Sequence, residues 1–260
     1  MTAIHPTAIV DAAATLGAEV TIGPYAVIGA GVDIGDRCQI GAHTVIEGPT
    51  RLGPDNRVFP FCSLGAAPQD KKYRGEPTRL EIGARNTIRE FCTFNRGTVQ
   101  DAGVTRLGDD NWIMAYVHLA HDCQIGNQTI FANNAQLAGH VQVGDWVILG
   151  GFTVVHQYVR IGAHSMTALG TILLQDLPPY VMAAGNPAAA RSINVEGLKR
   201  RGFAPEAIAA IRQAYKTLYR QGLALADARQ KIAAEAEAGH EAELMPLVRF
   251  LAEEGRGIVR

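Results

Sequence analysis

A six-residue period is the feature of this sequence that most constrains its fold. Large aliphatic residues recur at every sixth position, at Ile4, Val10, Leu16, Ile22, Ile28, Ile34, Ile40, Ile46, Leu52, Val58 and Leu64. The same phase resumes at Ile82, Ile88 and Phe94, and after a shift it runs through Leu107, Ile113, Leu119, Ile125, Phe131, Leu137, Val143, Leu149, Val155 and Ile161. Glycine often follows the aliphatic residue and can supply the unusual backbone angles of a tight corner. Each hexad therefore predicts one short strand plus a turn, and three hexads predict one coil of a parallel β-helix.

Two segments interrupt the period. Residues 66–78, Ala-Ala-Pro-Gln-Asp-Lys-Lys-Tyr-Arg-Gly-Glu-Pro-Thr, replace the aliphatic anchors with polar residues, and residues 99–106 shift the phase. A solenoid can accommodate extra residues only as loops, so both segments are expected to leave the coil. Each is either a tolerated surface insertion or a functional loop.

Composition and charge exclude several classes of protein. The chain has 260 residues, 47% of them hydrophobic, and a formal net charge of −1, so no overall charge points to a nucleic-acid partner. No apolar stretch approaches the roughly 18 residues of a membrane span, so we expect no integral membrane segment. The N-terminus lacks the basic start and apolar run of a signal peptide, which favours the cytoplasm. Cys38, Cys62, Cys92 and Cys123 each lie four residues after an aliphatic anchor, which predicts buried structural thiols rather than disulfides or zinc ligands.

From about residue 191 the hexads stop and helical spacing begins. We expect a β-helical domain over residues 1–190 and an α-helical domain over residues 191–260. Pro205 and Glu206 suit the first turn of a helix that Gly222 ends, and residues 226–238 and 241–254 predict two more helices. Seven Lys or Arg residues against two acids between 191 and 220 indicate either an anion-docking face or an ordinary solvated helix surface.

An eighteen-residue coil places four histidines and an aspartate in one patch. Residues eighteen apart stack about 4.8 Å from one another in adjacent coils. The columns are His121 with Gly139 and Gln157, Asp122 with His140 and Tyr158, and Ala120 with Ala138 and His156, while His118 lies at the edge of the patch.

Three interpretations of this patch remain open from spacing alone. The histidines are solvated turn residues, or three of them form a zinc site, or one of them is a general base. A neutral imidazole held by a carboxylate is a good base near neutral pH. Gly139, stacked on His121, leaves open space there and offers a backbone N–H where an oxyanion can form.

Several motifs resemble, across nearly the full length, the bacterial UDP-N-acetylglucosamine O-acyltransferases that begin lipid A synthesis. They are Gln-Asp-Lys-Lys-Tyr-Arg-Gly-Glu-Pro-Thr (69–78), Arg-Gly-Thr-Val-Gln (96–100), Ala-His-Asp-Cys (120–123), Asn-Asn-Ala-Gln-Leu-Ala-Gly-His-Val (133–141), Val-His-Gln-Tyr (155–158) and Glu-Gly-Leu-Lys-Arg-Arg-Gly-Phe (196–203). The resemblance implies that the β-helix is left-handed, which the spacing alone cannot give.

What this resemblance implies is a homotrimer with active sites in clefts between neighbouring solenoids. His121 would take the proton from the sugar 3-hydroxyl as it attacks the thioester of an (R)-3-hydroxyacyl group on acyl carrier protein. Asp122 would orient the imidazole, and the Gly139 N–H would bind the oxyanion. No metal or enzyme-bound cofactor is implied, because the carrier protein brings its own 4′-phosphopantetheine.

The resemblance also assigns substrate-binding residues. The first loop would contribute Gln69, Asp70 and Lys72 to sugar and acyl-hydroxyl contacts, and the helical region would bind the nucleotide. Lining the cleft would be His118, His140, His156 and Gln157, with Asn194, Glu196, Arg200 and Arg201 at the nucleotide.

Two residues depart from the better-known members. Leu169 occupies the place of a glycine at the end of the acyl groove, which predicts a shorter acyl chain of about ten carbons because overpacking is costly. Asn95 stands where histidine is expected, so a 3-amino analogue of the sugar nucleotide remains an alternative acceptor. The main rivals are the N-acyltransferase acting later in lipid A synthesis, a metal-dependent lyase of the gamma carbonic anhydrase type, and a structural solenoid without catalytic activity.

Overall fold

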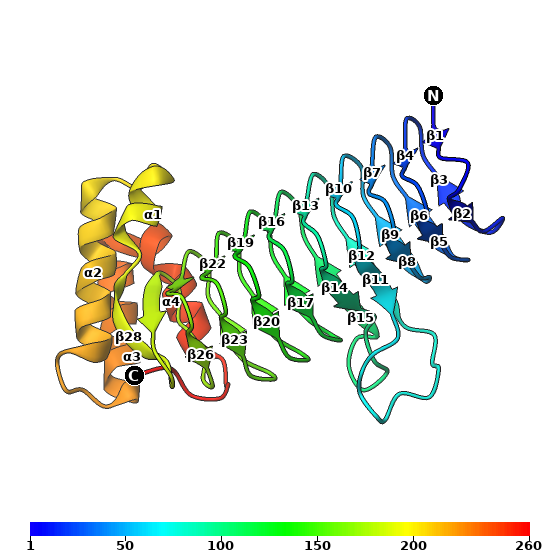
Figure 1. Cartoon of the computed structure of the whole chain (residues 1–260). Helices are drawn as coiled ribbons and strands as arrows, with labels where there is room; N and C mark the ends of the chain where they lie inside the picture. The colour runs from blue at the N-terminus through cyan, green and yellow to red at the C-terminus, as the bar shows by residue number, and fades with distance from the viewer.

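The computed structural model describes residues 1–260 as a left-handed parallel β-helix with helices at one end (Figure 1). Sheet A contains β1 (Ala3–Ile4), β4 (Thr21–Ile22), β7 (Gln39–Ile40), β10 (Arg57–Val58), β13 (Thr87–Ile88), β16 (Trp112–Ile113), β19 (Ile130–Phe131), β22 (Ile148–Leu149), β25 (Met166–Thr167), β27 (Val181–Ala184) and β28 (Ala189–Ile193). Sheet B contains β2 (Ile9–Val10), β5 (Val27–Ile28), β8 (Val45–Ile46), β11 (Ser63–Ala66), β14 (Thr93–Asn95), β17 (His118–Leu119), β20 (Gln136–Leu137), β23 (Val154–Val155) and β26 (Ile172–Leu173). Sheet C contains β3 (Thr15–Leu16), β6 (Val32–Ile34), β9 (Thr50–Leu52), β12 (Arg79–Ile82), β15 (Val104–Leu107), β18 (Gln124–Ile125), β21 (Gln142–Val143) and β24 (Arg160–Ile161).

The predicted register is confirmed by the strand pairing. Leu119 pairs with Leu137, which in turn pairs with Val155, so residues eighteen apart stack in adjacent coils. The aliphatic anchors from Ile22 onward are buried in one continuous core. Ile4 is 46% exposed because no coil packs on its outer side.

The buried cysteines are confirmed, whereas the explanation of the glycines is wrong. All four cysteines are buried and free. The left-handed backbone at most corners belongs to a non-glycine residue, such as His43 with φ +57°, and most of the glycines that directly follow the aliphatic anchors do not adopt it. The preceding Gly41 is needed because the next coil passes so close that a Cβ there would lie 2.6 Å from Pro60 N.

Both interruptions leave the solenoid as loops at the same corner, between sheets B and C (Figure 1). Residues 67–78 connect β11 to β12, and residues 96–103 connect β14 to β15. The second loop was predicted at residues 99–106, which is wrong at both ends. It begins directly after Asn95, and Val104 to Arg106 belong to β15, where Arg106 pairs with Glu81.

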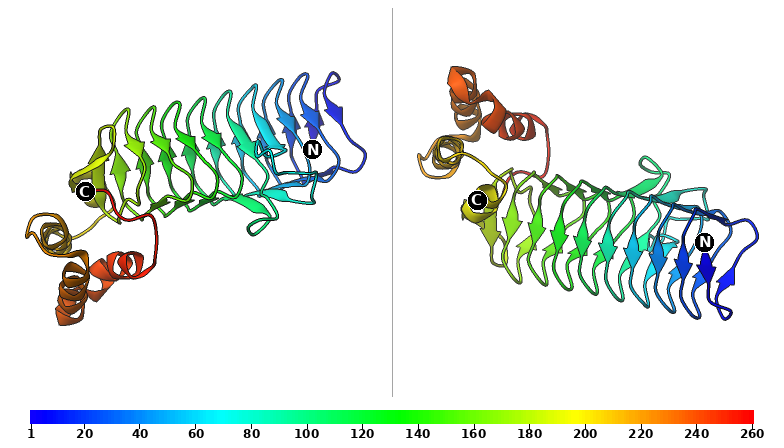
Figure 2. Two further views of the ribbon diagram at one scale, coloured as in Figure 1. Left: turned by 90° about the horizontal axis from the view of Figure 1, so that it is seen from below. Right: turned by 90° about the horizontal axis from the view of Figure 1, so that it is seen from above.

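The C-terminal region contains α1 (Val195–Arg200), α2 (Pro205–Tyr219), α3 (Leu225–Glu235), a short π-helix η1 (Ala236–His240) and α4 (Glu241–Ala252). These helices lie at the last coils and extend to one side of the solenoid axis (Figure 2). Pro205 begins α2 as expected, whereas α1 was not predicted from spacing because it is only six residues long. No helix is both long and apolar enough to cross a membrane.

Candidate active site

His121 and Asp122 form a buried pair in the turn between β17 and β18. The turn lies at the corner between sheets B and C, where the second loop leaves the solenoid one coil earlier and the first loop two coils earlier. His121 Nδ1 lies 2.9 Å from Asp122 Oδ2, and the side chains are 11% and 0% exposed. The two residues therefore meet in the geometry of a carboxylate that orients an imidazole.

Asp122 is held in place by the second loop. The Thr98 backbone N–H donates to Oδ1 at 2.8 Å, and the Thr98 hydroxyl donates to Oδ2. The Asp122 backbone N–H donates to Thr105 Oγ1 at 2.8 Å. Burial opposes ionisation, but hydrogen bonds from His121 and Thr98 hold the pKa of Asp122 below its usual range. An ionised carboxylate can only accept, so the hydrogen lies on His121 Nδ1 and Nε2 is free to act as a base.

Gly139 stacks on His121 as predicted, but it does not leave open space. A Cβ on Gly139 would lie 2.5 Å from His121 Cε1 and 2.7 Å from Nε2. The imidazole therefore fills the room that the missing side chain provides. The Gly139 N–H donates to no acceptor in the protein, which leaves it available to a bound oxyanion.

The other predicted cleft histidines differ in their surroundings. His118 on β17 shares a hydrogen bond of 2.7 Å between Nδ1 and Thr93 Oγ1, and burial, followed by the nearby His121, lowers the pKa of His118. His140 packs edge-on against His121 with ring centroids 5.0 Å apart. His156 is exposed, and its Nδ1 contacts its neighbour's carbonyl, Gln157 O, at 3.1 Å.

Residues Gln69, Asp70 and Lys72 of the first loop make no hydrogen bond to the His121–Asp122 pair. Asp70 Oδ1 accepts from the Lys72 backbone N–H at 2.9 Å, while the side chains of Gln69 and Lys72 are exposed. Buried Asn95 joins the loops by donating from Nδ2 to Ala67 O at 3.2 Å, and its Oδ1 has no partner.

The predicted nucleotide residues lie together in a different place. Asn194, Glu196, Arg200 and Arg201 line one pocket with Gln128, Ile130, Trp146, Ile148, Met166 and Gly197, which belong to sheet A, to the corner between sheets C and A, and to α1. Asn194 Oδ1 accepts from Gly197 N and caps α1, and Arg201 Nη2 donates to Trp146 O at 2.8 Å. Glu196 pairs with Lys199 at 3.0 Å, whereas Arg200 is exposed. Within one chain this pocket is not part of the His121 corner.

Leu169 also lies away from the His121 corner. Its side chain is at the corner between sheets A and B and is 75% exposed. It lies over Gly151, where an added Cβ would come within 3.1 Å of Leu169 Cδ1.

Donor atoms of His121, Asp122 and His140 lie within 4.8 Å of one another, so the patch is a conceivable metal site. Yet the Asp122 oxygens are already used by His121 and Thr98, and His140 Nδ1 is bound to Asp101 at 2.8 Å. A metal ion would have to displace these hydrogen bonds. The donor set fits acid–base chemistry better than a metal centre.

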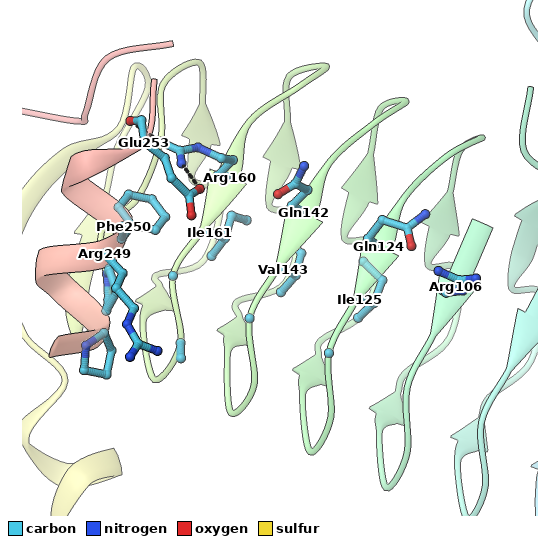
Figure 3. Close-up of a pocket in the computed structure, with 16 residues that line it drawn as sticks. Arg106, Gln124, Ile125, Gln142, Val143, Arg160, Ile161, Arg249, Phe250 and Glu253 are labelled. Atoms are coloured by element: carbon cyan, nitrogen blue, oxygen red, sulfur yellow. Dashed lines mark hydrogen bonds and ion pairs between the residues drawn. The ribbon is translucent and has the colours of Figure 1, made fainter. Parts of the chain in front are cut away.

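A large surface groove lies elsewhere, between the outer face of sheet C and α4 (Figure 3). Gln124, Gln142 and Arg160 face it from successive strands, and Arg160 is paired at 2.6 Å with Glu253, the residue directly after α4. It contains none of the predicted site residues, so we interpret it as a feature of how α4 packs on the solenoid.

Sequence reasoning missed three residues that contact the histidine patch. Thr98, Asp101 and Thr105 were not predicted, although Thr98 lies in a quoted motif and Asp101 is an acid within an expelled loop. The available signal was the position of the loop, one coil before the histidines.

Comparisons with known proteins identify the class and then the family. A hexapeptide-repeat model of bacterial transferases matches residues 4–48 and 105–139, which defines the class as a hexapeptide-repeat transferase. A model described as UDP-N-acetylglucosamine O-acyltransferase, domain 2, matches residues 176–259. The chain belongs to the family of acyl-[acyl-carrier-protein]–UDP-N-acetylglucosamine O-acyltransferases.

Individual relatives match over whole chains. The O-acyltransferase of Albidiferax ferrireducens is 63% identical over 264 residues, and that of Verminephrobacter eiseniae is 64% identical over 263, each match covering 100% of both proteins. The structure of the Francisella novicida UDP-N-acetylglucosamine acyltransferase has 39% identity and a TM-score of 0.96, over 99% of this chain and 94% of that one. The Moraxella catarrhalis O-acyltransferase has 41% identity and a TM-score of 0.95, over 99% of both chains.

Proposed function

We propose that this enzyme transfers an (R)-3-hydroxyacyl group from acyl carrier protein to the 3-hydroxyl of UDP-N-acetylglucosamine in lipid A biosynthesis. The names of the relatives support both substrates. The single observation that carries the chemistry is the buried His121–Asp122 pair with an unpaired Nε2. That nitrogen is the free base that transfer to a hydroxyl requires.

In the proposed reaction, His121 Nε2 removes the proton from the sugar 3-hydroxyl as its oxygen attacks the thioester carbonyl. The carbonyl oxygen becomes an oxyanion that the Gly139 N–H stabilises. The intermediate collapses, the C–S bond breaks, and the phosphopantetheine thiolate takes the proton back from the imidazolium. Asp122 stabilises the imidazolium between these two steps.

We further propose that the enzyme acts as a homotrimer. The catalytic corner, the Asn194–Arg201 pocket and Leu169 lie on different sides of one chain, so a neighbouring chain is needed to bring such groups together. The two sheets other than sheet C carry exposed apolar side chains, including Ile130 on sheet A and Val154 on sheet B.

A ladder of exposed aromatic rings runs along the corner between sheets A and B. Its members, with neighbouring ring centroids 4.9 to 5.2 Å apart, are Tyr25, His43, Phe61, Phe91 and Tyr116. Sheet C is polar instead, with ion pairs such as Glu81 to Arg106 at 2.8 Å. Large exposed apolar surfaces mark contacts between proteins, so the edge formed by sheets A and B is the side that we assign to the trimer.

The first loop, carrying Gln69, Asp70 and Lys72, is proposed to bind the sugar and the acyl hydroxyl. It leaves the same corner as the His121 turn. A 3-amino analogue of the sugar nucleotide remains the alternative substrate. The buried Asn95 Oδ1 has no hydrogen-bond partner, and an amide oxygen can accept a hydrogen bond from a 3-amino group.

The test is acyl transfer from 3-hydroxydecanoyl carrier protein to UDP-N-acetylglucosamine, in metal-free buffer with a chelator. Wild type is expected to turn over, and His121→Ala to lose about 10²-fold to 10⁴-fold in kcat. The matched control His5→Ala, at an exposed histidine of the first coil, should keep wild-type activity.

A chelator-sensitive wild type would contradict the metal-free mechanism. If wild type is inactive, the 3-amino sugar nucleotide and longer acyl donors are tested next. Failure with all of them would overturn the proposed function.

A further inference from the structure

A second carboxylate–imidazole pair lies directly beside the first. Asp101 Oδ2 is 2.8 Å from His140 Nδ1. Asp101 belongs to the 96–103 loop, whereas His140 lies in the turn after β20, one coil beyond His121. The contact therefore joins the expelled loop to the coil on the far side of the catalytic turn.

The His140 ring is restrained on every side. Its side chain is 7% exposed, and it stacks on Tyr158 with ring centroids 4.3 Å apart and planes 10° apart. It meets His121 nearly at a right angle, at 87°, and its Nε2 lies 3.8 Å from Asp122 Oδ2. Stacking on Tyr158 fixes the plane of the His140 ring but not which edge points toward the His121–Asp122 pair. A rotation of half a turn about the Cβ–Cγ bond exchanges the two edges and preserves the stack.

Asp101 selects one of these two orientations. A carboxylate only accepts, so it keeps a hydrogen on His140 Nδ1 and turns that edge toward the loop. Nε2 then lies on the side of Asp122, and the ring keeps its edge-on packing against His121. Asp101 itself is 49% exposed and makes no hydrogen bond or ion pair with His121 or Asp122, so we expect any effect on the reaction to pass through His140.

We propose that Asp101 is a positioning residue for acyl transfer, acting through His140 to hold the His121–Asp122 pair in its reactive geometry. The inference rests on the proposed function. Together with Thr98, which donates twice to Asp122, it makes the 96–103 loop the element that aligns both pairs.

The experiment is a double-mutant cycle in the full-length enzyme, using Asp101→Ala, His140→Ala and both changes together. Asp101→Ala should lower kcat about 10-fold to 100-fold, the scale of a small misplacement of reacting groups, and change KM for the sugar nucleotide less than twofold. In the His140→Ala background, Asp101→Ala should have no further effect, because residues that act as one unit are not additive.

Asp101→Asn provides the conservative variant. Its amide oxygen can still accept from His140 Nδ1, so kcat should return to within about threefold of wild type. Gln100→Ala, an exposed neighbour in the same loop, should leave kcat unchanged.

The inference would be overturned if Asp101→Ala left kcat unchanged. It would also be overturned if Asp101→Ala lowered kcat by the same factor in the presence of His140 and in the His140→Ala variant. Wild type and His121→Ala are measured in the same assay. If wild type turns over and His121→Ala has lost its activity, the proposed function stands even when the inference about Asp101 fails. Unfolding midpoints of Asp101→Ala and Asp101→Asn are expected to match that of wild type, since Asp101 is half exposed.

Discussion

Three neighbouring residues set the tautomer and the position of the His121 ring. Asp122 fixes its tautomer, Gly139 gives the ring room, and Thr98 keeps the carboxylate ionised and still. The proposed reaction needs all three at once, because a general base must have the right atom free, in the right place, at neutral pH.

Leu169→Gly tests the proposed limit on acyl chain length. The leucine side chain is 75% exposed at its corner, so it can project into a neighbour's acyl groove, where extra methylenes of substrate would overpack it. Removing it should raise kcat/KM for 3-hydroxytetradecanoyl relative to 3-hydroxydecanoyl carrier protein by about 10-fold or more, since overpacking costs about 1–3 kcal/mol. Competition between the two donors measures the ratio, and an unchanged ratio would refute the assignment.

The sequence predicted which residues of the candidate site lie side by side, but not the orientations of their side chains. Columns eighteen residues apart correctly brought together His121, Gly139, Asp122 and His140, because the repeat fixes the backbone. Spacing could not predict that the His121 ring fills the space at Gly139, since that depends on side-chain rotamers. Nor could it predict Asp101, because the path of an expelled loop is not set by the repeat.

Among the elements, the loops and α1 add contacts to the two candidate sites that the coils do not supply. The hexads predicted three sheets and the corner at which each turn lies. The short helix α1 was missed because six residues show too little periodicity. Contacts of the residues directly after it also position it: Arg201 lies over the Trp146 ring at 5.2 Å, and Phe203 packs edge-on against His164. The division into two domains at residue 190 stays a prediction, and β28 continues the strand pattern to Ile193.

The attachment of α1 should weaken in acid. Burial, followed by the Arg201 charge, lowers the pKa of His164 to about 4, while Asp145 acts weakly in the opposite direction. The unfolded chain therefore binds the proton more readily, and the stability is full above pH ~6.5 and is lost as pH falls toward about 4. The loss should be on the order of 1 kcal/mol, less than the full shift implies because the ring is partly exposed.

His164→Phe keeps a ring in the stack but does not titrate. Urea unfolding of both proteins at pH 7 and at pH ~4.5 should show a larger acid loss for wild type. Parallel pH profiles for the two proteins would count against this account of α1.

Over the whole molecule, the three faces of the solenoid differ in kind. Sheet C is lined with charged and amide side chains, whereas the edge between sheets A and B carries the aromatic ladder and exposed aliphatic residues. A single solenoid has no need for this asymmetry, which is why we assign one edge to contacts between chains.

A charged side chain introduced on sheet A or sheet B should therefore weaken the proposed trimer. Ile130→Glu and Val154→Glu should each shift the enzyme from trimer toward monomer and reduce turnover, because an unpaired charge would be desolvated in the contact. Gln142→Glu adds the same charge to sheet C and should leave the assembly intact. Analytical ultracentrifugation distinguishes these outcomes, and a wild type that is both monomeric and active would refute the trimer.

The eighteen-residue coil has one consequence for how such an enzyme can change over evolution. Inserting a single residue within a strand would turn inward-facing side chains outward, whereas an insertion at a corner leaves every later column in place. Both long loops occupy the corner that carries His121. New substrate contacts can thus arise beside the reacting atoms by changing loop length or sequence, while the core that supports them is inherited unaltered.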